Sequence, residues 1–444
     1  MKYDPNEALR DVKALSIPRR TGSPGEIQAQ NYIIQRFKAI GIEPREEAFS
    51  FNPVLGLISK GFLLIVLLLL TALRFLSPFY PLLGIILCFT ILILVVGFIW
   101  GKPVVALVGW VLFKDIPFLR KLRSKNIMAT WPVGGDSPAL SLRGTESRSN
   151  LPISTGIHSG LLRFARNDQE DVHVYILAHY DSKSQSLPLG IRIPLVMVLF
   201  VSVLFLVAYY FLSFWACLPL LGTFERVSFT LALTSGLTLF FTRTRNSSPG
   251  AIDNASGVAV MLQLAEAIKK EVQGFKGSKV QKFKGLKFHF VATGAEEEGL
   301  VGAFWLCESV GAYCSPRRIC LRHDNTPLQK NHFFINLDGV GTKGRIYCTS
   351  KTGLHPSSQK QKELLSLIEE AAENEGLKVY SPPLVIGAMA DHFPFVARGY
   401  NAVTFSTVSR RSLWVHTAWD APEVVESEGM ERVGKLILAV LAAY

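Results

Sequence analysis

The hydrophobic pattern divides the chain into two strongly apolar blocks and three stretches of ordinary mixed sequence. Each block contains two apolar runs with almost no charged residue, and a helix of about 20 such residues crosses a bilayer. The four runs are Gly61–Ser77, Leu82–Trp100, Ile193–Phe224 and Val227–Thr242. We therefore expect two transmembrane hairpins, within residues 56–113 and 191–243. The first block ends in Val104–Phe113, which is too short to span and is expected at the membrane interface.

In the mixed stretches, short apolar runs alternate with segments of helical periodicity. The runs expected to be strands are Asn126–Trp131, Val172–Ala178, Phe288–Ala292, Phe333–Leu337 and Ala402–Ser406. The segments expected to be helices are two amphipathic stretches before Gly41 and then residues 257–272, 299–311, 359–375 and 423–442. Alternation of this kind predicts an α/β fold with a mixed, mostly parallel sheet flanked by helices.

The two hairpins return the chain to the same side of the membrane each time. Residues 1–55, 114–190 and 244–444 can therefore fold together as one domain that the hairpins interrupt. Residues 134–170 are polar, rich in Ser, Arg and Asn, and have no sustained apolar period. This composition predicts a disordered insertion.

The net charge of +12 raises the question of a nucleic-acid partner. The basic residues crowd beside the apolar blocks and in two loops without a recognisable nucleic-acid motif, so we expect no such partner. On the domain side of the hairpins they outnumber those in the opposite loops, where Arg74 and Arg226 stand nearly alone. The positive-inside rule then predicts a multi-pass protein of about four spans with a cytoplasmic domain. The sequence leaves the oligomeric state open.

Carboxylates, histidines and glycines gather where the predicted strands end. Gly294-Ala295-Glu296-Glu297-Glu298-Gly299 follows one strand, and His179-Tyr180-Asp181-Ser182 ends another. Neighbouring side chains at a strand end point in different directions, so one glutamate can hold a cation while the next stays free to move a proton. In the second motif, Asp181 can accept the proton on the far ring nitrogen of His179 and fix its tautomer for metal binding.

Three further motifs supply potential partners. Asp253-Asn254-Ala255-Ser256-Gly257 opens a helix, Asn336-Leu337-Asp338 ends a strand, and Val415-His416-Thr417 lies near the C-terminus. Each motif alone is common: Asp253, for example, is equally suited to cap the helix that follows it. Their combination in one α/β chain predicts a metal site, because ligands in open α/β sheets bind at the carboxyl ends of the strands.

The order of these motifs resembles the co-catalytic di-zinc exopeptidases, a family that includes bacterial aminopeptidases, glutamate carboxypeptidases and the membrane-bound endoplasmic reticulum metallopeptidases. The resemblance covers an Arg-Thr-Gly-Ser-Pro-Gly-Glu stretch within residues 5–50 and then about 123–444 apart from the inserted pieces. It implies the zinc exopeptidase fold. The long membrane-containing gap between Asp181 and Asp253 departs from the soluble members, which have a short loop there.

The resemblance also implies roles for individual residues. One zinc would take His179, Asp253 and Asp338, and a second would take Asp253, Glu297 and His416, with Asp253 as the bridge. Glu296 matches the general base of the family, and Asp181 matches the residue that orients His179. Asp391 and His392 lie in a motif resembling one that lines the substrate pocket, although Ala390 stands where serine is usual.

These roles imply a membrane-anchored zinc-dependent exopeptidase that cleaves peptide bonds with a metal-bridging hydroxide and Glu296 as base. An aminopeptidase is the first expectation, and the sequence leaves the preference for amino or carboxyl ends open. The residue types do not exclude manganese or cobalt in place of zinc. A single-zinc acyltransferase similar to glutaminyl cyclases is the enzymatic alternative, and retention of both His179 and Asp338 argues against it. A catalytically silent peptidase-fold binding module is disfavoured by the intact set of ligands and base. A transporter would need ionisable groups within the spans, and the sequence shows almost none.

Overall fold

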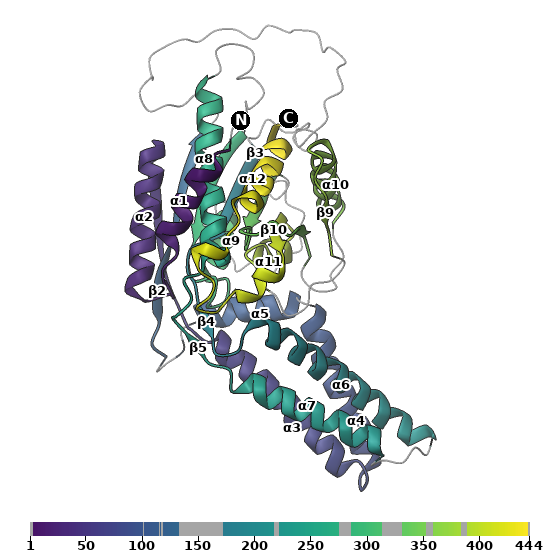
Figure 1. The fold of residues 1–444 in the computed structure, drawn as a ribbon. Coiled ribbons are helices and arrows are strands. Elements are labelled where there is room, and N and C mark those ends of the chain that lie inside the picture. Colours follow the sequence, from purple (N-terminus) through teal and green to yellow (C-terminus); the bar gives the residue numbers. More distant parts are fainter. Residues whose placement is uncertain are drawn as a thin grey trace.

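The computed structural model describes residues 3–100, 102–114, 116, 119–132, 172–216, 222–274, 286–312, 331–351, 358–382 and 389–442. The predicted insertion at 134–170 lies outside these residues. The described chain consists of an α/β domain and an arm of helices that projects from one end of it (Figure 1).

An eight-stranded sheet forms the centre of the α/β domain, in the order β1-β2-β6-β3-β7-β10-β8-β9. The strands are β1 (Pro44–Phe51), β2 (Leu122–Pro132), β3 (Val172–His179), β6 (Leu286–Thr293), β7 (His332–Leu337), β8 (Arg345–Thr349), β9 (Val379–Tyr380) and β10 (Asn401–Val408). The central strands β6, β3, β7 and β10 are parallel neighbours, whereas β2 pairs antiparallel with both β1 and β6. The predicted mixed, mostly parallel sheet is confirmed. It takes strands from all three mixed stretches of sequence.

Helices cover both faces of the sheet. One face carries α1 (Pro5–Leu15), α2 (Pro24–Ile40), α8 (Ser256–Gly274), α10 (Gln359–Asn374) and α12 (Ser427–Ala442), and the other carries α5 (Lys102–Phe113), α9 (Val301–Ala312) and α11 (Phe393–Ala397). Strand β3 is buried on both sides: Val174 and Ile176 join the first core, and Tyr175 and Leu177 join the second. Burial on both faces explains why this strand reads as a continuous apolar run.

The arm consists of four helices, α3 (Leu55–Leu76), α4 (Pro81–Trp100), α6 (Leu189–Ala216) and α7 (Thr223–Phe240), which share an apolar core. Two of them, Leu55–Leu76 and Leu189–Phe214, are long and apolar enough to cross a membrane. The expectation of four spans is thus supported for two helices of the described chain. Helix α7 is less apolar than the two candidate spans because it contains Thr, Ser and Glu residues.

One ion pair lies inside the arm, where the sequence suggested almost no ionisable groups. The fully buried Glu225 of α7 accepts a hydrogen bond of 2.8 Å from the Tyr210 hydroxyl and lies 3.2 Å from the Arg74 guanidinium. Arg74 also lies over the Phe229 ring. Arg74 of α3 and Glu225 of α7 therefore pair with each other, which is how charged groups are accommodated in an apolar helical core.

Arg19 links three parts of the α/β domain. Its fully buried guanidinium donates to the carbonyl oxygens of Leu15 and Ile17, of Tyr180 after β3, and of Pro249 and Gly250. We expect Arg19→Lys to lower the free energy of unfolding by at least about 2 kcal/mol, because an ammonium cannot reach all these acceptors and unpaired buried carbonyls are costly. The neighbouring variant Arg20→Lys keeps a positive charge opposite Glu298 in a pair whose Arg20 side chain is 36% exposed, and it should have little effect. Equal thermal unfolding midpoints for the two purified variants would contradict this assignment.

Candidate metal centre and active site

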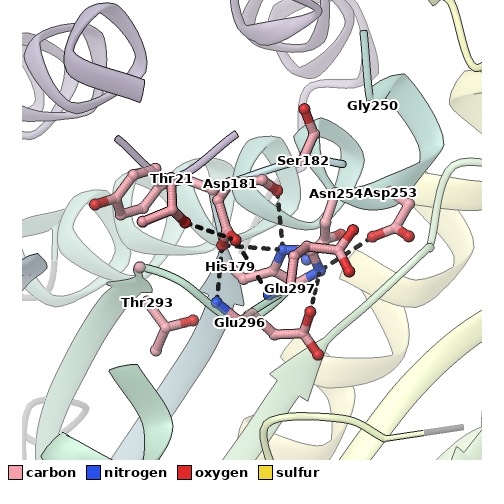
Figure 2. A network of polar contacts seen from close by, with 12 residues as sticks. Thr21, His179, Asp181, Ser182, Gly250, Asp253, Asn254, Thr293, Glu296 and Glu297 are labelled. Atoms are coloured by element: carbon pink, nitrogen blue, oxygen red, sulfur yellow. Dashed lines mark hydrogen bonds and ion pairs between the residues drawn. The ribbon is translucent and has the colours of Figure 1, made fainter. Parts of the chain in front are cut away.

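The predicted site residues come together where the strands meet the arm. His179 is the last residue of β3, Asp338 follows β7, and Glu296 and Glu297 follow β6. Asp253 lies in the short segment η2 (Ala251–Ala255) that leads into α8, at a kink where its backbone is not helical (φ −117°, ψ 90°). His416 follows the 3₁₀ helix η5 (Arg410–Trp414). The close-up shows the side chains of His179, Asp253, Glu296 and Glu297 converging (Figure 2).

The ligand-type atoms form two groups that share Asp253, one of His179, Asp253 and Asp338 and one of Asp253, Glu297 and His416. Within each group these atoms lie within 4.8 Å of one another. One Asp253 oxygen lies 3.0 Å from His179 Nε2, and the other lies 3.0 Å from His416 Nε2. Asp338 Oδ1 is 3.7 Å from His179 Nε2, and Glu297 Oε1 is 3.0 Å from His416 Nε2. Asp253 is thus placed as a bridge between the groups.

Side chains on either side hold the Asp253 turn in place. The Asp420 carboxylate accepts hydrogen bonds from the main-chain N–H groups of Ile252 and Asp253, at 2.7 and 3.2 Å. The Asn254 side chain donates to Leu337 O and accepts from Gly339 N, the residues on either side of Asp338. These contacts tie the turn before α8 to the end of β7.

Asp420→Asn should weaken metal binding by about 10-fold to 100-fold, as loss of a partner that orients a ligand typically does. The amide can accept only one of the two main-chain hydrogen bonds, so the Asp253 turn loses part of its support. Isothermal titration of the chelated protein with zinc measures the effect. Glu423→Gln, an exposed substitution three residues away, is the control, and an Asp420→Asn affinity equal to that of this control would refute the role.

The Asp181 carboxylate supports the glutamate turn. Its two oxygens accept hydrogen bonds from the main-chain N–H groups of Glu296 and Glu297, at 3.0 and 3.1 Å (Figure 2). His179 Nδ1 lies 3.1 Å from the main-chain oxygen of Asp181 and 3.7 Å from its carboxylate. The acceptor for the far nitrogen of His179 is therefore the peptide carbonyl of Asp181 rather than the carboxylate that the motif suggested.

Glu296 has the environment of a proton-transfer group. Its side chain is nearly buried and lies 3.9 Å from His179 Nε2, farther away than the Asp253 oxygen. Burial, together with the nearby Glu297, raises the pKa of Glu296 well above its usual value despite the opposing influence of His179. The preceding Ala295 has φ +57°, a left-handed conformation that non-glycine residues rarely adopt outside sites that require it.

Two cations near Glu297 and His416 were not predicted from the sequence. Lys183 Nζ lies 2.6 Å from Glu297 Oε2, and the Arg192 guanidinium lies 3.3 Å from His416 Nδ1. Arg192 belongs to α6, so the arm contributes a side chain to the site. A Lys two residues after Asp181 and an Arg at the start of an apolar helix carry no distinctive sequence signal.

The two predicted substrate-binding residues have different surroundings. Asp391 is fully buried, accepts a 2.5 Å hydrogen bond from Thr293 at the end of β6, and has its pKa raised by burial to about 7. His392 is also buried, with Nδ1 2.6 Å from the Thr404 hydroxyl and Nε2 3.3 Å from Lys351 O. Both nitrogens of His392 thus have partners within the fold, and only Asp391 keeps an oxygen without one among the described residues.

The charges of the two groups fit divalent cations. Burial alone would raise the pKa of Asp253, yet His179 and His416 hold it well below its usual value. Burial would lower the pKa of His416, but Glu297 and Asp253 raise it to about 9. A positive charge between these carboxylates therefore stabilises their ionised forms. Imidazole and carboxylate donors converging on one point are the ligand types that bind zinc in proteins.

Comparison with known proteins agrees with this chemistry. Residues 231–441 match the sequence profile of peptidase family M28. Aminopeptidase YwaD of Bacillus subtilis (strain 168) is 27% identical over 202 residues, which are 44% of this chain and 37% of that protein. The chain thus spans little more than a third of that curated relative. Over these residues the chain is therefore similar to peptidase family M28 and to an aminopeptidase.

Solved structures of similar chains include both peptidases and cyclases. An aminopeptidase from Aneurinibacillus sp. strain AM-1 has a TM-score of 0.49 at 15% identity, covering 99% of this chain and 93% of that one. The zinc aminopeptidase BSAP from Bacillus subtilis has a TM-score of 0.48 at 16% identity, covering 99% and 95%. A glutaminyl cyclase from an Acidobacteriales bacterium has a TM-score of 0.47 at 14% identity, covering 100% and 94%.

Proposed function

We propose that this protein is a membrane-anchored, zinc-dependent exopeptidase of the aminopeptidase type. The observation that supports this most directly is the pair of complete three-residue ligand groups joined by Asp253, with the Glu296 carboxylate left outside both. Two complete groups favour hydrolysis over the single-zinc acyltransferase, because that alternative gives no reason for both His179 and Asp338 to be in place.

In the proposed reaction, His179, Asp253 and Asp338 hold one zinc ion, and Asp253, Glu297 and His416 hold the other. When bound, the metals polarise the scissile carbonyl and make water acidic enough to be a nucleophile at neutral pH. Glu296 takes the proton from the attacking water and delivers it to the leaving amine. Asp181 keeps the glutamate turn in register, and Asp391 remains a candidate for contact with substrate.

For the membrane we propose four spans, with α4 and α7 completing two hairpins with α3 and α6. The two helices that are long and apolar enough to cross a bilayer support one member of each hairpin. Basic residues near the domain end of the arm, including Lys60, Lys114 and Arg243, support a cytoplasmic α/β domain. Cysteine-accessibility labelling at exposed positions of α10 and of the 77–80 turn would test this orientation, and labelling of both from the same side would contradict it.

A substrate panel tests the activity. Purified protein loaded with zinc should release the N-terminal residue from amino-acid anilides and dipeptides. N-terminally acetylated versions of the same substrates are the matched control and should not react, because an aminopeptidase requires a free amine. Cleavage of the acetylated peptides at their carboxyl ends would contradict the aminopeptidase assignment, and cyclisation of N-terminal glutamine without hydrolysis would replace it by the acyltransferase.

A further inference from the structure

An open groove lies where the α/β domain meets the arm, between the start of α6 and η5. Its volume is about 440 Å³, and it is lined by Pro188, Gly190, Arg410, Arg411, Leu413 and Trp414. Its walls are therefore apolar, with two arginines beside them. Trp414 packs edge-to-face against Trp419, and these side chains are 40% and 62% exposed. A partner that is both apolar and anionic would suit this surface, because it could contact the exposed tryptophans and pair with the arginines.

The groove lies level with the end of a candidate membrane span. Gly190 is in the first turn of α6, and the Leu413 side chain lies within 4 Å of the place a Gly190 side chain would occupy. The apolar stretch that is long enough to cross a membrane begins at Leu189. Since η5 touches this first turn, η5 lies at the depth where the span would leave the hydrocarbon. Trp and Arg are the residues that favour this interfacial layer.

A second feature of the same kind lies on α5, at the junction of domain and arm (Figure 1). Val105, Val108 and Leu112 bury one face of this helix against the domain. Its other face exposes Leu107 and Trp110, and the Lys114 ammonium lies 4.0 Å from the centre of the Trp110 ring. An aromatic side chain with a neighbouring cation thus occurs on two separate elements beside the arm.

Charge indicates which lipids the groove would accept. Arg411 lies 3.5 Å from Glu426 and donates to Val424 O. Its guanidinium is therefore partly neutralised by groups of the protein itself. Arg410 is exposed and has no ion pair within the described part of the chain. Arg410 lines the same groove as the apolar side chains of Leu413 and Trp414, and a guanidinium beside apolar side chains suits a phosphate joined to an acyl chain.

We propose that this groove binds the headgroup of an anionic phospholipid, so that the domain rests on the bilayer surface through η5 and α5. The inference depends on the membrane anchoring proposed above and extends it to a specific lipid site. His416 follows Trp414 by two residues, and Arg192 of α6 contacts His416. The metal centre therefore lies close to the proposed headgroup layer.

Tryptophan quenching by brominated lipids tests the proposal in the full chain reconstituted into vesicles. The emission of Trp414 and Trp419 is obtained as the difference between the wild type and the variants Trp414→Phe and Trp419→Phe. Brominated lipids should quench this part of the wild-type emission. The control is Trp131→Phe, because Trp131 packs against the core of the domain. The emission of Trp131, obtained by the same difference, should not be quenched by brominated lipids. If the emission of Trp414 and Trp419 is also unquenched, the groove faces water or another protein and the proposal fails.

Lipid charge is tested in vesicles of phosphatidylglycerol and phosphatidylcholine with bromine on only one of them. Quenching of Trp414 and Trp419 should be stronger with brominated phosphatidylglycerol, and Arg410→Glu should abolish the difference. Equal quenching in the wild type would refute the anionic site. If Arg410→Glu instead raises KM only for peptides with a free carboxylate, the groove binds substrate and the lipid assignment is wrong.

Two controls separate this result from the function proposed above. Flotation of the vesicles at high salt reports whether the arm is inserted, independently of the groove. Glu296→Gln should show the same quenching as the wild type, because the groove and the chemistry are different parts of the molecule. Loss of peptidase activity with unchanged quenching, or the reverse, then identifies which of the two proposals has failed.

Discussion

Replacing Glu296 by glutamine should reduce kcat by about 10²-fold to 10⁴-fold, the usual contribution of a general base, while the zinc content stays unchanged. The amide is nearly the same size as the carboxylate but cannot accept the proton of the attacking water. Glu296 belongs to neither ligand group, so its replacement removes no metal contact. Steady-state hydrolysis of an anilide and elemental analysis of the same preparation measure both quantities.

The acidic triplet itself provides the control. Glu298 pairs with Arg20 at 2.9 Å, away from the two ligand groups, and Glu298→Gln should retain most of the activity. Loss of zinc from Glu296→Gln would show that this residue is a ligand rather than a base. Equal loss of activity in both variants would show that the triplet acts through the shape of its turn.

Asp253→Ala should remove both metals and reduce hydrolysis to background, because this side chain is shared by the two groups. Asp338→Asn changes only the group of His179 and should leave the group of Glu297 and His416 able to bind. The two variants therefore predict different zinc contents after dialysis, none for the first and one for the second. A single zinc retained by Asp253→Ala would mean that the groups bind independently and that Asp253 is not a bridge.

The central strands and the site motifs could be predicted because each is determined by residues that are close together in the sequence. Strand β3 is apolar on both faces, and each motif stands directly at a strand end or a helix start, where the parallel topology brings it to the common edge. Strand β1 was not predicted: its residues Pro44–Phe51 include three charged side chains. It lies at the edge of the sheet and pairs only with β2. Few of its side chains are buried, so its sequence lacks the apolar run that indicates a strand.

Contacts between distant segments could not be predicted. Arg19 donates to carbonyl oxygens more than 160 residues away in the sequence, and carbonyl acceptors have no residue signature. Arg192 reaches His416 only because α6 packs beside η5. Likewise, the motif His179-Tyr180-Asp181 does not reveal that the Asp181 carboxylate turns toward the main chain of Glu296 and Glu297.

The zinc stoichiometry of activity tests the central claim most directly. The purified full chain would be stripped with a chelator and titrated with zinc while bound metal and anilide hydrolysis are followed together. Two equivalents bound per chain, with full activity reached only as the second is added, is the predicted result. Saturation of activity at one equivalent, or hydrolysis that persists in the stripped protein, would contradict a two-metal peptidase built around Asp253.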